Sequence, residues 1–338
     1  QKSPKRPALE INNKTWYNTC IMPDTVFRPV SDFAPKGEEA YQRLEYPYAR
    51  PTVSYLSDGT SICPLPEDDT FDDYTDATLA KHNVSLLSDR IPVVAYGANG
   101  SPVRFGEKMR EFGQSAEDKL LQVVPMRRVA LTGLRVVWQG IPGRFGNPIA
   151  VLTAEAGLRS ADAFLQYLTC EQLALLHASE GKIYKFVETE ATTLGGKNLR
   201  ALAYMANKTS VLYKNDEPVD VRISEEWPDA GNSMTAREAM QYILNLAGFA
   251  VGVGIRNPEE YIRFVNATGI HAFDRSDIQK SIQRVLEGKG ACVPYTFGAG
   301  KVPYGRADFN NIWPVAPGVI LLPEQRLHRI RPDEAGVA

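Results

Sequence analysis

Hydrophobic and polar positions change their pattern twice along this chain of 338 residues. The first ninety or so residues are rich in Pro, Asp and Tyr with weak periodicity, so we expect mostly loop. One exception is residues 52–66, where short alternating segments flank Asp58-Gly59 and predict a β-hairpin. The acidic run from Glu67 to Asp76 lacks apolar spacing and predicts a solvated loop.

A new core begins at Ile91, where a continuous apolar run ending in Tyr-Gly predicts a buried strand and a tight turn. Residues 127–138 alternate around Gly133, which predicts a bent pair of strands or one strand with a bulge. Thr169 is the expected N-cap of a helix that runs to Glu180 and stops at Gly181. Four short strands are also expected, at 149–152, 163–165, 183–189 and 199–205, the last two around the turn at Gly195-Gly196.

The pattern becomes helical after Asn232. Thr235 and Glu238 form a capping box for a helix to about Leu246, and two further helices are expected at Pro258–Val265 and Arg275–Leu286. From Gly290 onward the chain is again rich in Pro and Gly. These changes predict three parts: residues 1–88, 89–226 and 227–338.

The composition is that of an ordinary soluble globular enzyme. The chain is 43% hydrophobic and 23% charged with a formal net charge of -2, and it lacks the clustered Lys and Arg of a nucleic-acid-binding surface. Its longest apolar stretches, Ile243–Ile255 and Val315–Leu322, are too short to cross a bilayer. We therefore expect no nucleic-acid or membrane partner and a cytoplasmic location, with secretion of a trimmed chain left open.

Neither a metal nor an organic cofactor is expected. The four cysteines lie far apart without a C-x-x-C pair, which favours buried, reduced thiols. The four histidines are scattered, with no H-E-x-x-H motif. A Walker loop is also missing, because Val302 follows Gly298-Ala299-Gly300-Lys301 where a hydroxyl residue is required. The chemistry must then rest on carboxylates, tyrosines and backbone groups.

One candidate feature is the turn Tyr96-Gly97-Ala98-Asn99-Gly100. Its glycines let consecutive N–H groups point at one anion, and we infer for Gly97 either a positive φ or a close approach of the backbone to another group. Most such turns only reverse the chain, and that alternative stays open.

Glu180, Tyr184 and Tyr204 are the other candidates. The Glu180 carboxylate ends an apolar helix, where the helix dipole and burial both disfavour a negative charge and so favour proton exchange. A solvated helix end is the alternative. Tyr184 and Tyr204 lie on the following strands, where they are half-buried sheet residues by default, although their hydroxyls could orient a polar substrate.

The order of these motifs resembles the γ-glutamylcyclotransferase-like family over the middle of the chain. The segments that carry the resemblance are Tyr96-Gly97-Ala98-Asn99, 128–136, 168–173, 176–181, Tyr184 and Ala203-Tyr204. The family turn is usually Tyr-Gly-Ser-Asn and its helix usually ends Leu-Asp-x-x-Glu-Gly. Here Ala98 replaces Ser and His177 replaces Asp, while Glu180 is matched.

The resemblance implies an α+β fold: a mixed β-barrel with surrounding helices, a loop-rich N-terminal extension and a helical C-terminal extension. It also implies that the α-amine of a γ-glutamyl conjugate attacks its own γ-carbonyl, releasing 5-oxoproline and a free amine. Glu180 would be the general acid/base, the turn would bind the carboxylate or the oxyanion, and Tyr184 and Tyr204 would contact the substrate.

Two alternatives remain at this point. Closure of a related lactam or lactone would use the same machinery. A non-catalytic binding or assembly module on the same fold would explain the changes at Ala98 and His177. The leaving group and the oligomeric state are left open.

Overall fold

The computed structural model describes residues 27–112, 122–143, 145–180, 184–206, 208–222, 231–248, 255–267 and 272–296. Its strands are β1 (Arg28–Pro29), β2 (Tyr55–Ser57), β3 (Ser61–Pro64), β4 (Ile91–Ala95), β5 (Val124–Trp138), β6 (Ala150–Leu168), β7 (Tyr184–Thr193), β8 (Asn198–Ala206), β9 (Lys208–Lys214), β10 (Glu217–Pro218), β11 (Asp220–Val221), β12 (Ser233–Met234) and β13 (Cys292–Thr296). Its helices are α2 (Glu39–Leu44), α3 (Phe71–Lys81), α4 (Pro102–Phe112), α5 (Cys170–Glu180), α6 (Ala236–Ala247), α7 (Pro258–Asn266) and α8 (Ala272–Gly288), with 3-10 turns η1 (Val30–Phe33), η2 (Leu87–Asp89) and η3 (Ala98–Gly100).

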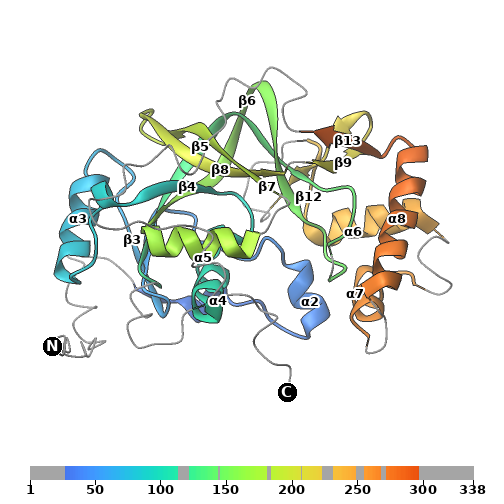
Figure 1. Ribbon diagram of the computed structural model, residues 1–338, viewed down its shortest axis with the longest axis horizontal. Coiled ribbons are helices and arrows are strands. Elements are labelled where there is room, and N and C mark those ends of the chain that lie inside the picture. Colours follow the sequence, from blue (N-terminus) through green and yellow to red (C-terminus); the bar gives the residue numbers. More distant parts are fainter. Residues whose placement is uncertain are drawn as a thin grey trace, which may run out of the picture.

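Five strands close on themselves into a barrel. Around the ring the order is β5, β6, β4, β8, β7 and back to β5. The β4–β8 pair is parallel and the other four pairs are antiparallel. Helices α4 and α5 lie together beneath the barrel strands, and α6, α7 and α8 lie at one end of the molecule (Figure 1). The predicted α+β class, a mixed barrel with surrounding helices, is confirmed.

The two longest described strands of this barrel are β5 and β6, which pair with each other. Gly133 has a φ of 73°, and the β5–β6 register shifts on both sides of Ala130–Thr132. Of the two predictions for residues 127–138, one bulged strand is therefore correct. The prediction of separate short strands at 149–152 and 163–165 is wrong, because β6 runs through both. Pairing along the length of β5 keeps the polar and small residues between them extended, which local composition does not reveal.

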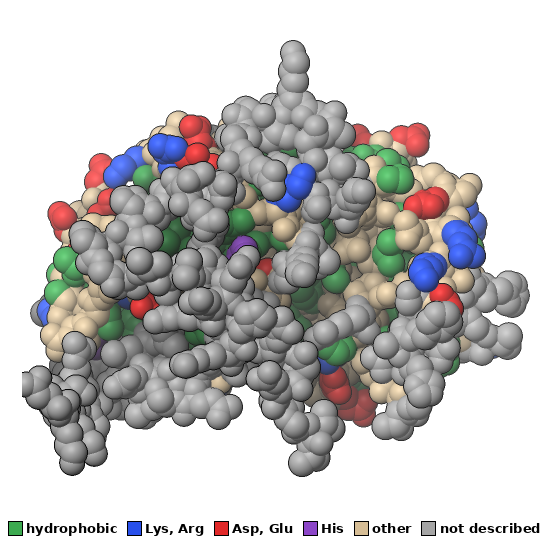
Figure 2. All heavy atoms as spheres, viewed as in Figure 1, with side chains coloured by type: hydrophobic (Ala, Val, Ile, Leu, Met, Phe, Trp, Pro, Cys, Tyr) green, Lys and Arg blue, Asp and Glu red, His purple; other side chains and the backbone are tan. Residues whose placement is uncertain are grey.

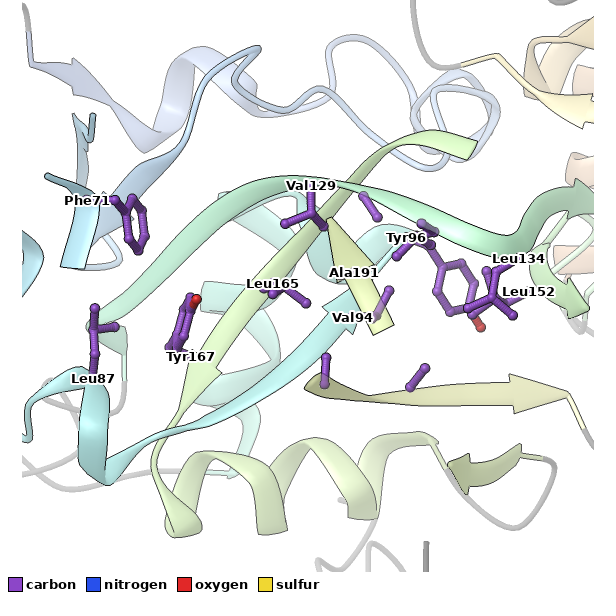
Figure 3. Close-up of a cluster of buried hydrophobic side chains, with 14 of the residues drawn as sticks. Phe71, Leu87, Val94, Tyr96, Val129, Leu134, Leu152, Leu165, Tyr167 and Ala191 are labelled. Carbon is purple, nitrogen blue, oxygen red and sulfur yellow. The ribbon is translucent and has the colours of Figure 1, made fainter. Parts of the chain in front are cut away.

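Successive residues of the barrel strands alternate between two apolar layers, as strand geometry requires. Val94 of β4 and Tyr96, which follows it, point into the barrel, where they pack with Leu134 and Leu152 (Figure 3). Val93 points outward, as do the side chains at matching positions of the neighbouring barrel strands, and these side chains pack against α4 and α5. The barrel therefore has one core inside its wall and a second core between the wall and the two helices.

The N-terminal part adds strands to the same sheet. β2 pairs with β5, β3 with β2, and β1 with β3, all antiparallel. The hairpin prediction is confirmed, with Gly59 at a φ of 85° in the turn. The division of the chain at residue 88 stays a prediction, and the hydrogen-bonded ladder crosses it.

The predicted solvated loop at 67–76 is wrong, because α3 begins at Phe71. Phe71, Thr75 and Leu79 are fully buried at helical spacing. The acidic residues Asp72, Asp73 and Asp76 are less buried than these three and mask the pattern in the sequence.

The predicted helix ends are mostly confirmed. Thr169 caps α5, since its hydroxyl accepts from the Gln172 N–H and its own N–H donates to the Gln172 side chain. The capping box of Thr235 and Glu238 is present at the start of α6. The predicted stop at Gly181 lies outside the described residues. The antiparallel pairing of β13 with β9 was not predicted, and it ties the C-terminal helices to a separate three-stranded sheet of order β10, β9, β13.

The expectation of reduced thiols is wrong for Cys63, which is disulfide-bonded. A disulfide depends on proximity in space, which spacing along the chain does not report. Cys170 and Cys292 are free, and burial raises the pKa of the Cys292 thiol to about 11. The cytoplasmic location and its secreted alternative both stay predictions.

On the face shown in Figure 2, the described acidic and basic side chains are interspersed around the rim, with hydrophobic side chains visible nearer the middle. Of the helices in the described ranges, none has both the length and the apolar content needed to span a bilayer.

Candidate active site

The end of α5, the turn after β4 and helix α4 meet around Glu180. The Glu180 Oε1 atom accepts a hydrogen bond of 2.9 Å from Nδ2 of Asn99 and one of 2.6 Å from Nζ of Lys108. The structure therefore brings together two residues that the sequence predicted separately, the carboxylate and the asparagine of the turn.

Lys108 completes a triangle of polar groups with these two residues. Its Nζ also donates to Oδ1 of Asn99 at 2.7 Å, so the asparagine amide presents its oxygen to the ammonium and its nitrogen to the carboxylate. The side chains of Lys108 and Glu180 are only 21% and 14% exposed. The ion pair is thus partly withdrawn from water. Charge interactions are stronger in such a partly buried site than at an open surface.

Lys108 is not among the predicted site residues, because the sequence pattern predicts no helix or strand at residues 102–112. The signal was weak: Phe105 and Met109 are buried at a helical spacing of four, and Lys108 lies at the edge of the face they define. Only the packing of α4 beside α5 brings this lysine to the end of α5.

The turn after β4 is a 3-10 turn held by its own backbone. The Gly100 N–H donates to the Gly97 carbonyl and the Ser101 N–H donates to the Ala98 carbonyl, both at 3.0 Å. These bonds do not use the N–H groups of Gly97, Ala98 and Asn99. The Gly100 carbonyl in turn accepts from the Tyr55 hydroxyl at 2.9 Å, so Gly100 serves to fix the turn.

Close packing explains the glycine at position 97. Its φ is −106°, so the positive φ named as one alternative does not occur. A Cβ atom at this position would stand 2.8 Å from the hydroxyl oxygen of Tyr46. The second alternative, a close approach, is correct, with a tyrosine side chain as the neighbour.

Tyr184 and Tyr204 lie beside the carboxylate. Burial raises the pKa of each phenol, and the negative charge of Glu180 raises it further. Both therefore stay protonated at neutral pH, which suits them to donate hydrogen bonds and not to accept protons. Their rings contact each other edge to face, with centroids 6.3 Å apart.

Tyr96 and Tyr46 support this arrangement from behind. Tyr96 lies in the barrel interior (Figure 3), and its hydroxyl donates to the Tyr204 carbonyl at 2.8 Å. Tyr46 comes from the N-terminal segment, and its hydroxyl accepts from the Ala150 N–H at 3.3 Å. Burial raises the pKa of Tyr46, with smaller increases from Tyr184 and Glu180. Nothing in the weakly patterned N-terminal sequence pointed to Tyr46.

His177, one turn before Glu180 on α5, is a neutral neighbour. Burial lowers its pKa, and the charge of Glu180 opposes this only in part. Its Nδ1 lies 3.3 Å from the Tyr204 hydroxyl. Where the family motif has a second carboxylate, this chain therefore places an uncharged ring.

Two further observations concern the described part of the chain. No group of three His, Cys, Asp or Glu side chains there is arranged to hold a metal ion. A cavity of about 260 Å³ lies elsewhere, between α2 and α7, and is lined by Glu38, Glu39, Ala40, Ile262, Arg263 and Asn266. Its charged lining residues pair with neighbours at the surface, as Arg263 does with Glu38.

Comparison with known proteins gives only distant similarity. No protein-family model matches the chain, and no curated protein matches it. A solved γ-glutamyl cyclotransferase is 15% identical with a TM-score of 0.28, over 56% of this chain and 98% of its own. An uncharacterized Homo sapiens protein is 15% identical with a TM-score of 0.28, over 36% and 69%. An Arabidopsis thaliana protein is 18% identical with a TM-score of 0.27, over 41% and 78%.

The first of these structures carries the name of the family that the sequence motifs resemble. At such identities and scores the similarity does not bear on the reaction. The case for a function therefore rests on the geometry around Glu180.

Proposed function

We propose that the protein is a γ-glutamylcyclotransferase-like enzyme that cyclises a γ-glutamyl or related acyl conjugate, with Glu180 as general acid/base. The observation that supports this most is the contact between the Glu180 carboxylate and Asn99 of the turn. It joins a proton acceptor, a set of backbone donors and two protonated phenols at one end of a closed barrel.

In this proposal Glu180 moves the protons. It takes one from the substrate α-ammonium, the freed amine attacks the γ-carbonyl, and Glu180 passes that proton to the leaving nitrogen as the C–N bond breaks. The attacking nitrogen then loses its second proton to Glu180, which returns it to the released amine, so that the amine leaves as an ammonium. The products are 5-oxoproline and an amine. Ring closure within one molecule needs little further machinery, because well-oriented intramolecular reactions reach effective molarities of about 10⁵ to 10⁸ M.

The turn and the phenols would stabilise the oxyanion that forms on the γ-carbon. The N–H groups of Gly97, Ala98 and Asn99 stand outside the internal bonds of the turn, and the hydroxyls of Tyr184 and Tyr204 are protonated donors beside Glu180. Tyr96 and Gly100, also predicted to bind the ligand, would act by holding these donors in place.

A non-catalytic binding module is the second candidate. Lys108 favours it, since an ammonium 2.6 Å from the carboxylate occupies the group that must accept a proton. A related lactam or lactone closure differs only in the substrate and would be found by the same assay.

The test is release of 5-oxoproline or a related ring from a panel of γ-glutamyl compounds, followed by mass spectrometry. We expect Glu180→Gln to lower kcat by about 10² to 10⁴, because the amide keeps the volume but cannot carry the proton. Glu171→Gln, an exposed carboxylate on the same helix, is the matched control and should behave as wild type. Retention of more than about a tenth of kcat by Glu180→Gln would exclude this role.

A further inference from the structure

The ion pair at the candidate site contains both charges of an amino acid, held side by side. The Lys108 ammonium and the Glu180 carboxylate are 2.6 Å apart and mostly shielded from water. Asn99 bridges them with both ends of its amide, which fixes their relative positions. The proposed acid/base chemistry uses Glu180 and leaves Lys108 without a role.

We propose that Lys108 is a specificity-determining residue that binds the α-carboxylate of the substrate. The proposal rests on the function proposed above and deepens it. An α-amino acid carries an ammonium and a carboxylate on one carbon atom, so it is the electrostatic complement of the Lys108–Glu180 pair. On binding, the substrate ammonium takes the place of Lys108 at Glu180, and the substrate carboxylate takes the place of Glu180 at Lys108.

This exchange leaves no charge unpaired in a partly buried site, because one ion pair within the protein is replaced by two between protein and substrate. Removing charged groups from water is costly, and here the two protein groups are already largely desolvated in the resting protein. Lys108 is on a flexible four-carbon stem, so its ammonium can move by the width of a carboxylate while Asn99 continues to accept from it. A ligand with only one of the two charges would leave one protein charge unpaired.

This arrangement predicts selectivity for ligands that carry both an α-ammonium and an α-carboxylate. The neighbouring cation on α4, Arg104, is paired with Glu107. Lys108 is instead directed at Glu180 and Asn99, the two groups on which the proposed chemistry depends. If Lys108 only held Glu180 in position, its removal would affect every substrate equally.

The experiment compares two anilides that differ by one group. L-γ-Glutamyl anilide carries the α-carboxylate, and 4-aminobutanoyl anilide lacks it but closes a lactam of the same size. The ratio of kcat/KM for the two is measured in the wild type and in Lys108→Met. We expect the preference for the γ-glutamyl compound to fall about 10- to 100-fold in Lys108→Met, mainly through KM, as for loss of a hydrogen bond between charged groups.

Effects on Glu180 itself are common to both substrates and cancel in this ratio. Lys108→Arg, which keeps the charge, should restore part of the preference. Arg110→Met, which removes an exposed cation from the same helix, is the control and should leave the ratio as in wild type. Thermal unfolding of each variant verifies that it folds. An equal loss on both anilides, or no loss on either, would overturn the proposal.

Failure of the proposed function gives a different result. If the wild type closes neither ring, the same four proteins are titrated with the two anilides by calorimetry. Lys108→Met should then lose affinity for the γ-glutamyl compound alone, and equal affinities in wild type and Lys108→Met would contradict the role of Lys108.

Discussion

The end of the barrel around Glu180 and the C-terminal helices α6 to α8 bury different kinds of side chain. The barrel end places an ion pair and several phenols in a partly buried site. The helical region buries mainly hydrocarbon, with Ala239, Met240 and Ile243 fully enclosed. The cavity of about 260 Å³ borders the helical region. This cavity therefore lies apart from the polar groups around Glu180, and we assign function to those polar groups.

The largest expected effect among changes that leave every charge in place comes from Gly97→Val. The new side chain would stand against the Tyr46 hydroxyl, so the turn must move and its N–H groups lose their alignment. We expect kcat/KM to fall by the equivalent of about 3 to 4 kcal/mol, as for loss of one oxyanion donor. Ala98→Ser, the residue of the family turn, should be mild. A folded Gly97→Val protein with wild-type kinetics would show that the turn only reverses the chain.

Ile243→Ala should produce the opposite result in the helical region. Its side chain is fully buried, so truncation should lower the free energy of unfolding by about 2 to 5 kcal/mol. Denaturant titration measures this loss, and activity per folded molecule should not change. Loss of activity with unchanged stability would show that the helical region belongs to the functional site, and would contradict the distinction between the two regions.

Tyr204→Phe and Tyr242→Phe test the two regions with the same chemical change. The Tyr204 hydroxyl lies 3.3 Å from His177 near the carboxylate, and the Tyr242 hydroxyl donates to the Tyr213 carbonyl at 3.2 Å in the helical region. We expect Tyr204→Phe to lower kcat/KM by about tenfold and Tyr242→Phe to lower stability by about 1 kcal/mol. Equal kinetic effects of the two variants would contradict the assignment of Tyr204 as a substrate contact.

The smallest expected effect is the contribution of His177 to the pH dependence of the protein's stability. Burial holds its folded-state pKa below the unfolded value of about 6.5, so the unfolded chain binds the proton first as pH falls. The contribution of neutral His177 to the free energy of unfolding should therefore be fully present above about pH 6.5 and be lost as the pH falls below it. His177→Gln should show a smaller difference in Tm between pH 7.5 and pH 5.5. Burial also lowers the pKa of His82. His82→Gln should therefore also reduce the difference in Tm between the two pH values, without altering turnover.

Local signals in the sequence predicted much of the fold. The Asp58-Gly59 turn, the Thr169 cap and the bulge at Gly133 each depend on a few neighbouring residues, and each is present. Such signals act within one or two turns of chain, so they can be found without knowledge of the tertiary structure.

The candidate site was predicted only in part, because half of it depends on contacts between distant segments. Glu180 and Asn99 carry a motif, whereas Lys108 and Tyr46 reach the site only after α4 and the N-terminal segment have packed. The disulfide of Cys63 was missed for the same reason.

The most direct test of the account is a crystal structure of the protein with 5-oxoproline bound. We expect the ligand within hydrogen-bonding distance of the Glu180 carboxyl group and of the N–H groups of Gly97 to Asn99, with Lys108 moved from Glu180 to the ligand carboxylate. A ligand in the cavity between α2 and α7, with the Lys108–Glu180 pair intact, would contradict it.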